Sequence, residues 1–418
     1  MSASAAPLGP AERLREVIAR HRAGDHAAAE VGYREHLREF PQDPSALHFL
    51  GLLRSHQGKK EEAVKLMVAA LEADPEYVDA WSNLGVTYFR LHDYERAEFC
   101  ARKAIEISPD FANAWANLGM TLRARNDGEQ ALIAWGRALD LQPGMRNIAI
   151  SYGNLLYRLD RRPEALEFYR KWQASMPDDP IAAHMVAALG GASTPERASN
   201  GFVRETFDDF AESFDHNLEE LHYRAPQLLA AAVERHVPRA PGQKFVTLDV
   251  GCGTGLCGPL LRAMSRRLVG VDLSPNMLSK AALRAVYEQL NCGELTEWLT
   301  GCYERFDLAV AADVFCYFGD LSVAFTNVRK VLVPGGYFVF SLESVREDAA
   351  IGHGGTAGEA SLEDHYVLRS HGRYQHDREY VRGTLVAAGL EVVSIETDTL
   401  RYERMEPVVG LLTVARLS

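Results

Sequence analysis

A chain of 418 residues is longer than one hydrophobic core usually supports, so we expect two domains. Its apolar fraction of 47% and charged fraction of 24% are typical of a globular, water-soluble protein, which excludes long disorder and a membrane protein. The net charge of -12 lies mostly in the second half, because residues 1–190 carry 23 basic and 26 acidic side chains and the remainder carries 22 and 31. We expect no nucleic-acid partner, since an acidic domain repels phosphate backbones.

Neither a targeting signal nor a cysteine framework is indicated. Met1–Pro10 has no basic start and no run of large apolar residues, so we expect a cytoplasmic protein without a membrane span. The cysteines form no Cys-x-x-Cys pair and are sparse, which favours reduced thiols over disulfides or structural zinc. We assign no metal, because the histidines also lack a compact ligand spacing.

The first half of the chain repeats with a period of 34 residues. The recurring residues are Gly51, Gly85, Gly119 and Gly153; Ala29, Ala63, Ala97, Ala131 and Ala165; and Pro41, Pro75, Pro109, Pro143 and Pro177. Each unit predicts two amphipathic helices that bury their apolar faces only by stacking on neighbouring units, with proline ending the second helix. We expect five units over residues 11–179 and a capping helix at Ile181–Leu189, so the array covers residues 11–189.

The best units contain Trp81-x2-Leu84-Gly85-x2-Tyr88 and its equivalent 34 residues later, and they resemble tetratricopeptide repeats. The first unit departs from the pattern, since Val17 stands where glycine is expected. The resemblance implies an all-α solenoid whose concave surface binds a protein or peptide partner. Asn83 and Asn117 occupy equivalent positions, where paired amides either grip a peptide backbone or make local contacts within the array.

A Gly-Ser-Thr-Pro stretch at 190–200 predicts a linker, so a second domain is expected over residues 201–418. Phe245–Val250 is a short β-branched strand that runs into a glycine turn. A helix is expected at Leu256–Met264, followed by a second strand at Leu268–Val271 that terminates at Asp272. This βαβ order places an acid at the tip of the second strand, where parallel sheets bind nucleosides.

The turn reads D-V-G-C-G-T-G, and it resembles the motif of class I S-adenosylmethionine-dependent methyltransferases, most closely the ubiquinone and menaquinone biosynthesis-like group. The resemblance implies an α/β Rossmann-like domain with a seven-stranded, mostly parallel sheet, with S-adenosylmethionine as cofactor and S-adenosylhomocysteine as product. It implies that Asp249 orders the methionyl amino end and Asp272 the ribose hydroxyls. Glu294 either contacts the adenine amino group or caps a helix. The expected cofactor-binding residues are Asp249, Gly251, Cys252, Gly253, Thr254, Gly255, Asp272, Leu273, Glu294, Leu295, Asp313 and Val314.

The remaining strands follow in the expected order. The third is predicted within Tyr287–Gly293 and the fourth at Phe306–Asp313. A turn at Val333–Gly336 precedes the fifth strand, Tyr337–Leu342. The last two are predicted at residues 392–396 and 408–415, which completes the seven-stranded sheet.

Two segments outside this core could bind the methyl acceptor. In Phe202–Tyr223, three phenylalanines share one helix face, which could cover cofactor and acceptor or simply pack on the domain. The predicted substrate-binding residues are Phe207, Phe214, Tyr223, Phe315 and Tyr317. The second segment, Ser344–Asp377, is rich in glycine and histidine and is predicted to be a loop that acts as a lid. Its His371, Tyr374 and His376 are the catalytic candidates, although such side chains can also be structural.

These patterns favour a methyltransferase whose array binds a partner or a substrate protein, with a protein side chain or a quinone-like or lipid-like molecule as acceptor. One alternative is a scaffold that binds the cofactor without turnover. A nicotinamide oxidoreductase is opposed by the glycine spacing, since G-x-G-x-x-G requires glycine at Leu256.

Overall fold

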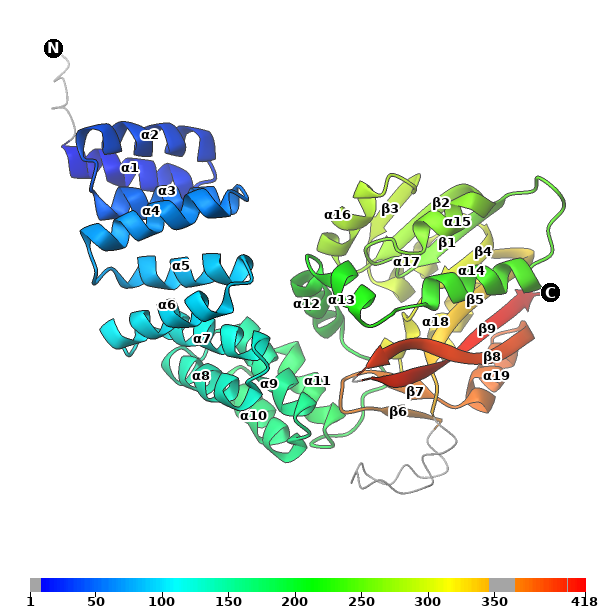
Figure 1. Cartoon of the computed structure of the whole chain (residues 1–418). Helices are drawn as coiled ribbons and strands as arrows, with labels where there is room; N and C mark the ends of the chain where they lie inside the picture. Colours follow the sequence, from blue (N-terminus) through cyan, green and yellow to red (C-terminus); the bar gives the residue numbers. More distant parts are fainter. Residues whose placement is uncertain (1–8, 346–364, 404) are drawn as a thin grey trace, which may run out of the picture. The chain divides into compact units, whose positions relative to one another are not determined.

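The computed structural model describes residues 9–345, 365–403 and 405–418, and Figure 1 shows their helices and strands. The chain divides into two compact units between Arg161 and Arg162. This division falls inside the fifth predicted repeat, whereas the sequence placed the domain boundary at 190–200. The predicted boundary therefore stays a prediction, and each compact unit is described by itself.

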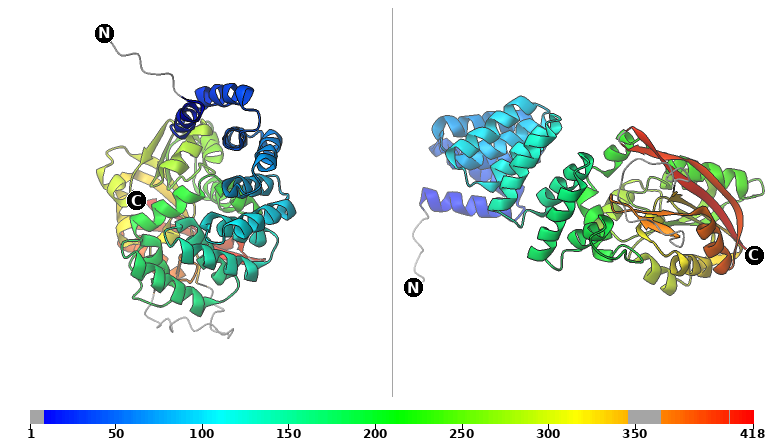
Figure 2. Two further views of the ribbon diagram at one scale, coloured as in Figure 1. Left: turned by 90° about the vertical axis from the view of Figure 1, so that its left-hand side faces the viewer. Right: turned by 90° about the horizontal axis from the view of Figure 1, so that it is seen from below.

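The first unit is a stack of antiparallel helices, as Figure 2 shows from two further sides. The helices alternate in the predicted 34-residue period, so the solenoid predicted from the sequence is confirmed. They are α1 Pro10–Arg22, α2 His26–Glu39, α3 Pro44–His56, α4 Lys60–Ala73, α5 Val78–Arg90, α6 Tyr94–Ile107, α7 Ala112–Ala124, α8 Gly128–Leu141 and α9 Arg146–Arg158.

The recurring glycines allow paired helices to approach closely. A Cβ atom added at Gly119 would lie 2.4 Å from Trp135, and one added at Gly85 would lie 3.3 Å from the Ala97 carbonyl. In the first repeat the small residue lies on the second helix instead of the first, because a Cβ atom added at Gly32 would lie 2.4 Å from Val17. The same close contact is thus kept where the sequence pattern departs from glycine.

The second unit begins with α10 Arg162–Ser175 and α11 Pro180–Ala188, and continues into an α/β domain. Its other helices are α12 Asn200–Phe210, α13 Phe214–Glu220, α14 Ala225–His236, α15 Gly258–Met264, α16 Pro275–Leu283, α17 Leu295–Gly301, the 3₁₀ turn η1 Phe315–Tyr317, α18 Ser322–Val331 and α19 Arg378–Ala387. Its strands are β1 Phe245–Val250, β2 Ser265–Asp272, β3 Gln289–Cys292, β4 Phe306–Ala311, β5 Leu332–Glu343, β6 Tyr366–Leu368, β7 Tyr374–His376, β8 Leu390–Glu403 and β9 Glu406–Leu417.

The main sheet has seven strands in the order β3-β2-β1-β4-β5-β9-β8, with β1 to β5 parallel and β9 antiparallel to its neighbours. One apolar core joins it to α17, α18 and α19, and a second core on the other face joins it to α14 and α15. The predicted mostly parallel sheet is therefore confirmed. The long β8–β9 hairpin forms one edge of this sheet, and Figure 2 shows that it is strongly twisted.

The predicted loop at Ser344–Asp377 contains a short antiparallel hairpin, β6–β7, and its residues 346–364 lie outside the described part. Helix α11 packs on this hairpin. The His184 ring nitrogen Nε2 is 2.8 Å from the carbonyl oxygen of Gly372, and Ala187 and Ala188 share an apolar cluster with Leu368 and Tyr374. This last helix of the predicted array is thus built into the second unit.

The described residues contain neither a membrane-spanning helix nor a cluster of metal ligands. No helix in residues 9–345, 365–403 or 405–418 is long and apolar enough to cross a membrane. The same residues contain no group of three or more His, Cys, Asp or Glu side chains arranged to hold a metal ion.

Candidate active site

The glycine turn follows β1 at the carboxyl edge of the sheet. Gly251, Gly253 and Gly255 have φ angles of 62°, 53° and 81°, which favour glycine at each position. A Cβ atom added at Gly251 would lie 2.5 Å from Val314, whereas one at Gly253 would meet nothing within 4 Å. The backbone of Gly253 therefore faces open space that a ligand can enter.

Asp272, at the end of β2, lies beside this turn. Its Oδ2 accepts the N–H of Gly253 at 2.8 Å and its Oδ1 accepts the N–H of Ser274 at 2.9 Å. Burial raises the pKa of Asp272 above its usual range, although these backbone hydrogen bonds oppose the shift. The sequence predicted this adjacency, because the carboxyl ends of neighbouring parallel strands meet at one edge.

Asp249 is 1% exposed and accepts a hydrogen bond from the Tyr287 hydroxyl at 2.6 Å. Burial raises the pKa of Asp249 to about 7, while the Tyr287 hydrogen bond lowers it and the charge of Asp272 raises it. The Tyr287 ring also lies close to Gly255 and Gly258. Sequence reasoning missed Tyr287, since it placed this residue only at the edge of a predicted strand.

Glu294 caps the N-terminus of α17. Its Oε2 accepts the backbone N–H of Glu297 at 2.8 Å and the Thr296 hydroxyl at 2.5 Å, and its Oε1 accepts from Arg197 at 3.0 Å. Burial tends to raise the pKa of Glu294, but the contacts with Thr296, Glu297 and Arg197 outweigh it and hold this pKa below its usual range. The residue is 8% exposed, so the cap is buried. Leu295 is buried beside it, and Leu273 is half-buried after β2.

Strand β4 ends at Ala311, two residues earlier than predicted. Asp313 follows it and has a φ angle of 53°. Its Oδ1 accepts the Ser341 hydroxyl at 2.6 Å, and its Oδ2 accepts from Arg401 at 2.8 Å. Burial raises the pKa of Asp313, and the nearby Arg401 charge opposes that shift. A non-glycine residue held in left-handed backbone at a strand end is typical of functional sites.

Next to Asp313 lies a group of charged side chains, in which Glu343 and Arg401 are buried and Arg373 and Glu403 are partly exposed. Arg401 donates to Glu343 and, at 2.8 Å, to Glu403; Arg373 donates to the same two carboxylates at 2.5 Å. Although burial opposes it, the charges of Arg373 and Arg401 hold the pKa of Glu343 well below its usual range. These residues come from β5, β8 and the β6–β7 turn, so no sequence motif joined them.

The three catalytic candidates all have protein partners. His371 Nδ1 accepts the backbone N–H of Arg373 at 3.2 Å, its Nε2 is 3.7 Å from Glu343 Oε2, and burial lowers its pKa to about 3. His376 is fully buried with Nε2 3.1 Å from the Gly319 carbonyl, and burial lowers its pKa to about 4. The Tyr374 hydroxyl donates to the Pro195 carbonyl at 2.8 Å. A catalytic role for these residues stays a prediction.

The predicted substrate-binding residues divide into two groups. The Phe207 ring lies 5.9 Å from Phe214 and 5.4 Å from Tyr317, and burial together with the charge of Asp313 raises the pKa of Tyr223. These four therefore lie around the carboxyl end of β4 or close to Asp313. Phe315 is instead fully buried in the aromatic core beneath the sheet.

The α12–α13 segment lies against the glycine turn and α16. Asp215 Oδ1 accepts the Thr254 hydroxyl at 2.5 Å, and Asp215 also pairs with Arg284. Asp208 accepts the Ser274 hydroxyl at 2.5 Å. The segment forms two helices, with Phe210 at the end of α12 and Phe214 at the start of α13, so the prediction of one helix face that carries all three phenylalanines is wrong. The contacts fix both helices on the domain, and their covering of the ligand site stays a prediction.

Comparison with known proteins agrees with this geometry. A methyltransferase domain model matches residues 248–340, and tetratricopeptide repeat models match residues 44–77, 78–111 and 100–133. The chain carries tetratricopeptide repeats and a class I methyltransferase domain. The domain match runs from within β1 to within β5, and this range includes the glycine turn, Asp272 and Asp313.

Individual relatives match the methyltransferase domain. Methyltransferase-like protein 27 of Homo sapiens is 38% identical over 112 residues, which is 24% of this chain and 45% of that protein. Ubiquinone biosynthesis O-methyltransferase of Cereibacter sphaeroides is 29% identical over 119 residues, 28% of this chain and 48% of that protein. The chain thus spans less than half the length of either relative. A structure of magnesium protoporphyrin IX methyltransferase from Synechocystis PCC 6803 is similar with a TM-score of 0.40 and 15% identity, over 53% of this chain and 100% of that one.

Proposed function

We propose that the second unit is an S-adenosylmethionine-dependent methyltransferase and that the first unit binds its partner or substrate protein. The observation that carries the proposal is the open space at Gly253, between Asp249 at the end of β1 and Asp272 at the end of β2. Part of the cofactor, such as its ribose, can occupy the space that a Cβ atom would fill in any residue other than glycine. The residues present fit this cofactor.

Each residue at this edge has a matching role. Asp272 offers two acceptor oxygens to the ribose hydroxyls, and Asp249 offers a negative charge to the methionyl ammonium group. Glu294 and Leu295 border the adenine side, and Asp313 and Val314 line the side nearest the acceptor. When bound, the cofactor supplies a methyl group on a positively charged sulfur, which an aligned nucleophile can accept.

The acceptor is positioned by the cluster of Phe207, Phe214 and Tyr317 and by Tyr223, which lies close to Asp313. Methyl transfer depends on the alignment of the acceptor with the methyl group, so aromatic side chains that orient it can supply much of the rate. A general base is needed only for an acceptor whose proton is hard to remove. His371 is a candidate for that role because it faces Glu343, while its low pKa favours the structural alternative.

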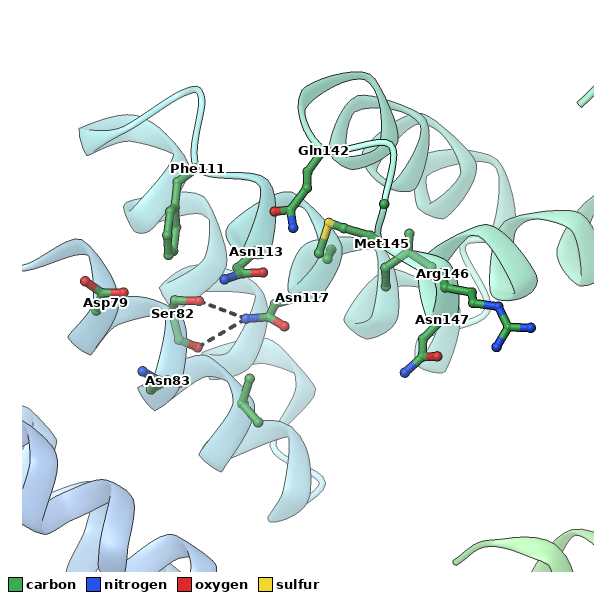
Figure 3. Close-up of a pocket in the computed structure, with 14 residues that line it drawn as sticks. Asp79, Ser82, Asn83, Phe111, Asn113, Asn117, Gln142, Met145, Arg146 and Asn147 are labelled. Carbon is green, nitrogen blue, oxygen red and sulfur yellow. Dashed lines mark hydrogen bonds between the residues drawn. The ribbon is translucent and has the colours of Figure 1, made fainter. Parts of the chain in front are cut away.

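A groove of about 620 Å³ in the first unit supports partner binding, and Figure 3 shows its polar lining. Asn117 Nδ2 donates to the Ser82 hydroxyl at 2.9 Å, and Asn83 Nδ2 lies 3.0 Å from His48 Nε2. Both amide nitrogens thus make contacts within the array, which is the second alternative that the sequence left open. The amide oxygens can still accept hydrogen bonds from a peptide. The groove residues are Asp79, Ser82, Asn83, Val86, Phe111, Asn113, Ala116, Asn117, Gln142, Gly144, Met145, Arg146, Asn147 and Ile148.

The decisive experiment for the enzyme is radiolabelled methyl transfer from S-adenosylmethionine into a lysate of the source organism, resolved into protein, lipid and small-molecule fractions. Label in one fraction identifies the acceptor class. Tight binding of S-adenosylmethionine without transfer to any fraction would favour the scaffold alternative. Binding of NADH and not of S-adenosylmethionine, measured by calorimetry, would overturn the proposal.

The partner surface is tested by the double substitution Asn83→Ala and Asn117→Ala. Loss of one peptide hydrogen bond from each amide oxygen, at about 1 kcal/mol each, predicts partner capture weaker by roughly tenfold or more. The matched control is Gln130→Ala, which removes an exposed amide on α8 outside the groove. Unchanged capture by the folded double variant would assign both asparagines to packing between repeats.

A further inference from the structure

Three arginines lie on the helix face that lines the groove of the first unit. Arg90, Arg123 and Arg158 are found near the ends of α5, α7 and α9, and their side chains reach solvent. Each follows a groove residue of its own helix by four, seven or eleven positions, which is close to one, two or three helical turns. These groove residues are Val86, Ala116 and Asn147. The three arginines, here named the arginine row, therefore continue the groove face along consecutive helices.

The arginine row has no carboxylate partner within the part of the chain that the structure describes. Carboxylates lie nearby, but they pair with other arginines. Arg125 donates to Glu98, and Arg161 donates to Glu129 at 2.7 Å. Further arginines of this unit with a carboxylate partner are Arg13, Arg54 and Arg137. The positive charge of the row is thus left for a partner to neutralise.

The charges of the row also lie close to other cationic or titratable groups. Partial burial lowers the pKa of Arg123, and the positive charge of Arg158 lowers it further. Burial and then the charge of Arg90 lower the pKa of His56, which ends α3. Arg90 Nη1 lies 3.5 Å from the Ser55 hydroxyl of the same helix. Like charges at close range repel one another in the free protein, and an anionic ligand relieves that repulsion.

The spacing of the helices sets the spacing of the ligand groups. Consecutive first helices of the repeats are in direct contact, since Asn117 of α7 donates to the Ser82 hydroxyl of α5. Helices packed in this way lie about 8–10 Å apart. An extended peptide rises about 3.3–3.6 Å per residue, so about three residues span one helix spacing. A peptide laid across α5, α7 and α9 therefore places every third side chain against the next arginine.

The groove beside the row favours a peptide over a nucleic acid. Its lining includes the carboxylate of Asp79 and the amides of Asn83 and Asn117, as Figure 3 shows. The oxygen atoms of these groups accept hydrogen bonds, which the N–H groups of a peptide backbone can donate. A phosphate backbone offers acceptors instead, and the Asp79 carboxylate repels it.

We propose that the arginine row binds an extended acidic segment of a partner protein, with Asp or Glu at every third position. The inference rests on the proposed function and deepens it, because it names the chemistry of the partner that the groove takes. Each guanidinium can donate two parallel hydrogen bonds to one carboxylate. The groove contacts the peptide backbone, and the row selects the acidic side chains.

The test begins with selection from a random library of phage-displayed peptides of about 12 residues, long enough to span three helices. The full-length protein should enrich peptides that carry Asp or Glu at intervals of three. The most enriched peptide is then synthesised with a fluorescent label, and its affinity is measured by polarisation. Raising NaCl from about 0.05 M to about 0.5 M should weaken binding by about tenfold, because exposed ion pairs are screened.

The triple substitution Arg90→Gln, Arg123→Gln and Arg158→Gln should weaken this peptide by about tenfold or more, because three ion pairs are lost. It should also remove most of the salt dependence. Its unfolding temperature should not fall below that of the wild type, since the substitution removes repulsion between like charges. Lysine at the same three positions should retain most of the affinity. Glutamine in place of the acidic residues of the peptide should weaken binding to the wild-type protein by a similar factor.

The matched control is the triple substitution Lys65→Gln, Arg96→Gln and Arg137→Gln. It removes the same charge from exposed positions on α4, α6 and α8, outside the groove, and should change the affinity by no more than about twofold. A single-stranded oligo-uridine of about the same length serves as the nucleic-acid probe.

The outcomes separate the inference from the proposed function. Enriched peptides without regularly spaced acidic residues, or equal weakening by the row and control substitutions, would overturn the inference and leave the groove as a partner site. Tighter binding of the oligo-uridine than of the peptide would overturn it in favour of a nucleic-acid partner. The absence of any enriched peptide would overturn both the inference and the proposed partner groove. Methyl transfer enters none of these measurements.

Discussion

Replacing Tyr287 by phenylalanine should change the pH dependence of cofactor binding. The substitution removes only the hydroxyl that donates to Asp249 at 2.6 Å and keeps the ring beside Gly255 and Gly258. That hydrogen bond favours the ionised carboxylate, which is the form that pairs with the ammonium group of the ligand. Its loss therefore favours protonated Asp249 and weakens binding near neutral pH.

The magnitude follows from the strength of the bond. A hydrogen bond to a charged group contributes about 1.5–3 kcal/mol, and 1.36 kcal/mol corresponds to one pH unit. The pKa of Asp249, raised by burial to about 7, should therefore rise further by roughly one to two pH units in Tyr287→Phe. Wild-type affinity should fall as the pH drops below 7, whereas the affinity of the variant should fall from a higher pH. At pH 7 the variant should bind about tenfold more weakly, and the difference should shrink to about twofold or less by about pH 9.

The assay is calorimetric titration with S-adenosylhomocysteine from pH 6 to pH 9. Taking the ratio of the two affinities at each pH cancels the ionisation of the ligand itself. Tyr303→Phe is the matched control, because Tyr303 is 96% exposed and should give a ratio of one throughout. A ratio for Tyr287→Phe that does not vary with pH would refute the reasoning, since it would show that the hydroxyl does not set the ionisation of Asp249.

Three further predictions concern the site and the domain boundary. Asp272→Ala should weaken S-adenosylmethionine binding by roughly 2–4 kcal/mol without unfolding, and unchanged calorimetric affinity would remove Asp272 from the site. A fragment that begins at Arg162 should fold and bind the cofactor, whereas one that begins at Ser199 should lose roughly 3 kcal/mol of stability through exposure of Leu368 and neighbouring apolar groups, as measured by urea denaturation. His371→Gln should leave the rate of transfer to a known acceptor nearly unchanged, because burial lowers the pKa of His371 to about 3 and makes it a weak base. A clear loss of rate with unchanged S-adenosylhomocysteine affinity would instead give His371 a catalytic role.

The sequence alone determined the features that are local or periodic. The 34-residue recurrence gave the helix pairs, because each unit must bury the same apolar face against its neighbour. The run at Phe245–Val250 coincides with β1, and the motif that follows it indicated Asp249, Asp272 and the glycine turn. These signals survive in a single chain because strand, turn and helix each depend on residues close together in sequence.

Only the tertiary structure decided which distant side chains meet. Tyr287 reaches Asp249 and Arg197 reaches Glu294 across 38 and 97 residues, and Arg401 reaches Asp313 across 88. The partners Tyr287, Arg197 and Arg401 lie in the segment before β3, in the segment before α12 and on β8. The folding of the chain brings these distant segments to the carboxyl ends of the parallel strands, and nothing in the spacing of either partner predicts that contact.

The same reason accounts for the elements that sequence analysis placed incompletely. Strands β6 and β7 span three residues each, too short for an alternating pattern to identify, so their segment was predicted only as a loop. Helix α11 has the composition of a repeat helix, yet it packs on this hairpin through His184 and its neighbours. Composition determines that such a helix must bury an apolar face, and the tertiary structure decides which surface covers it.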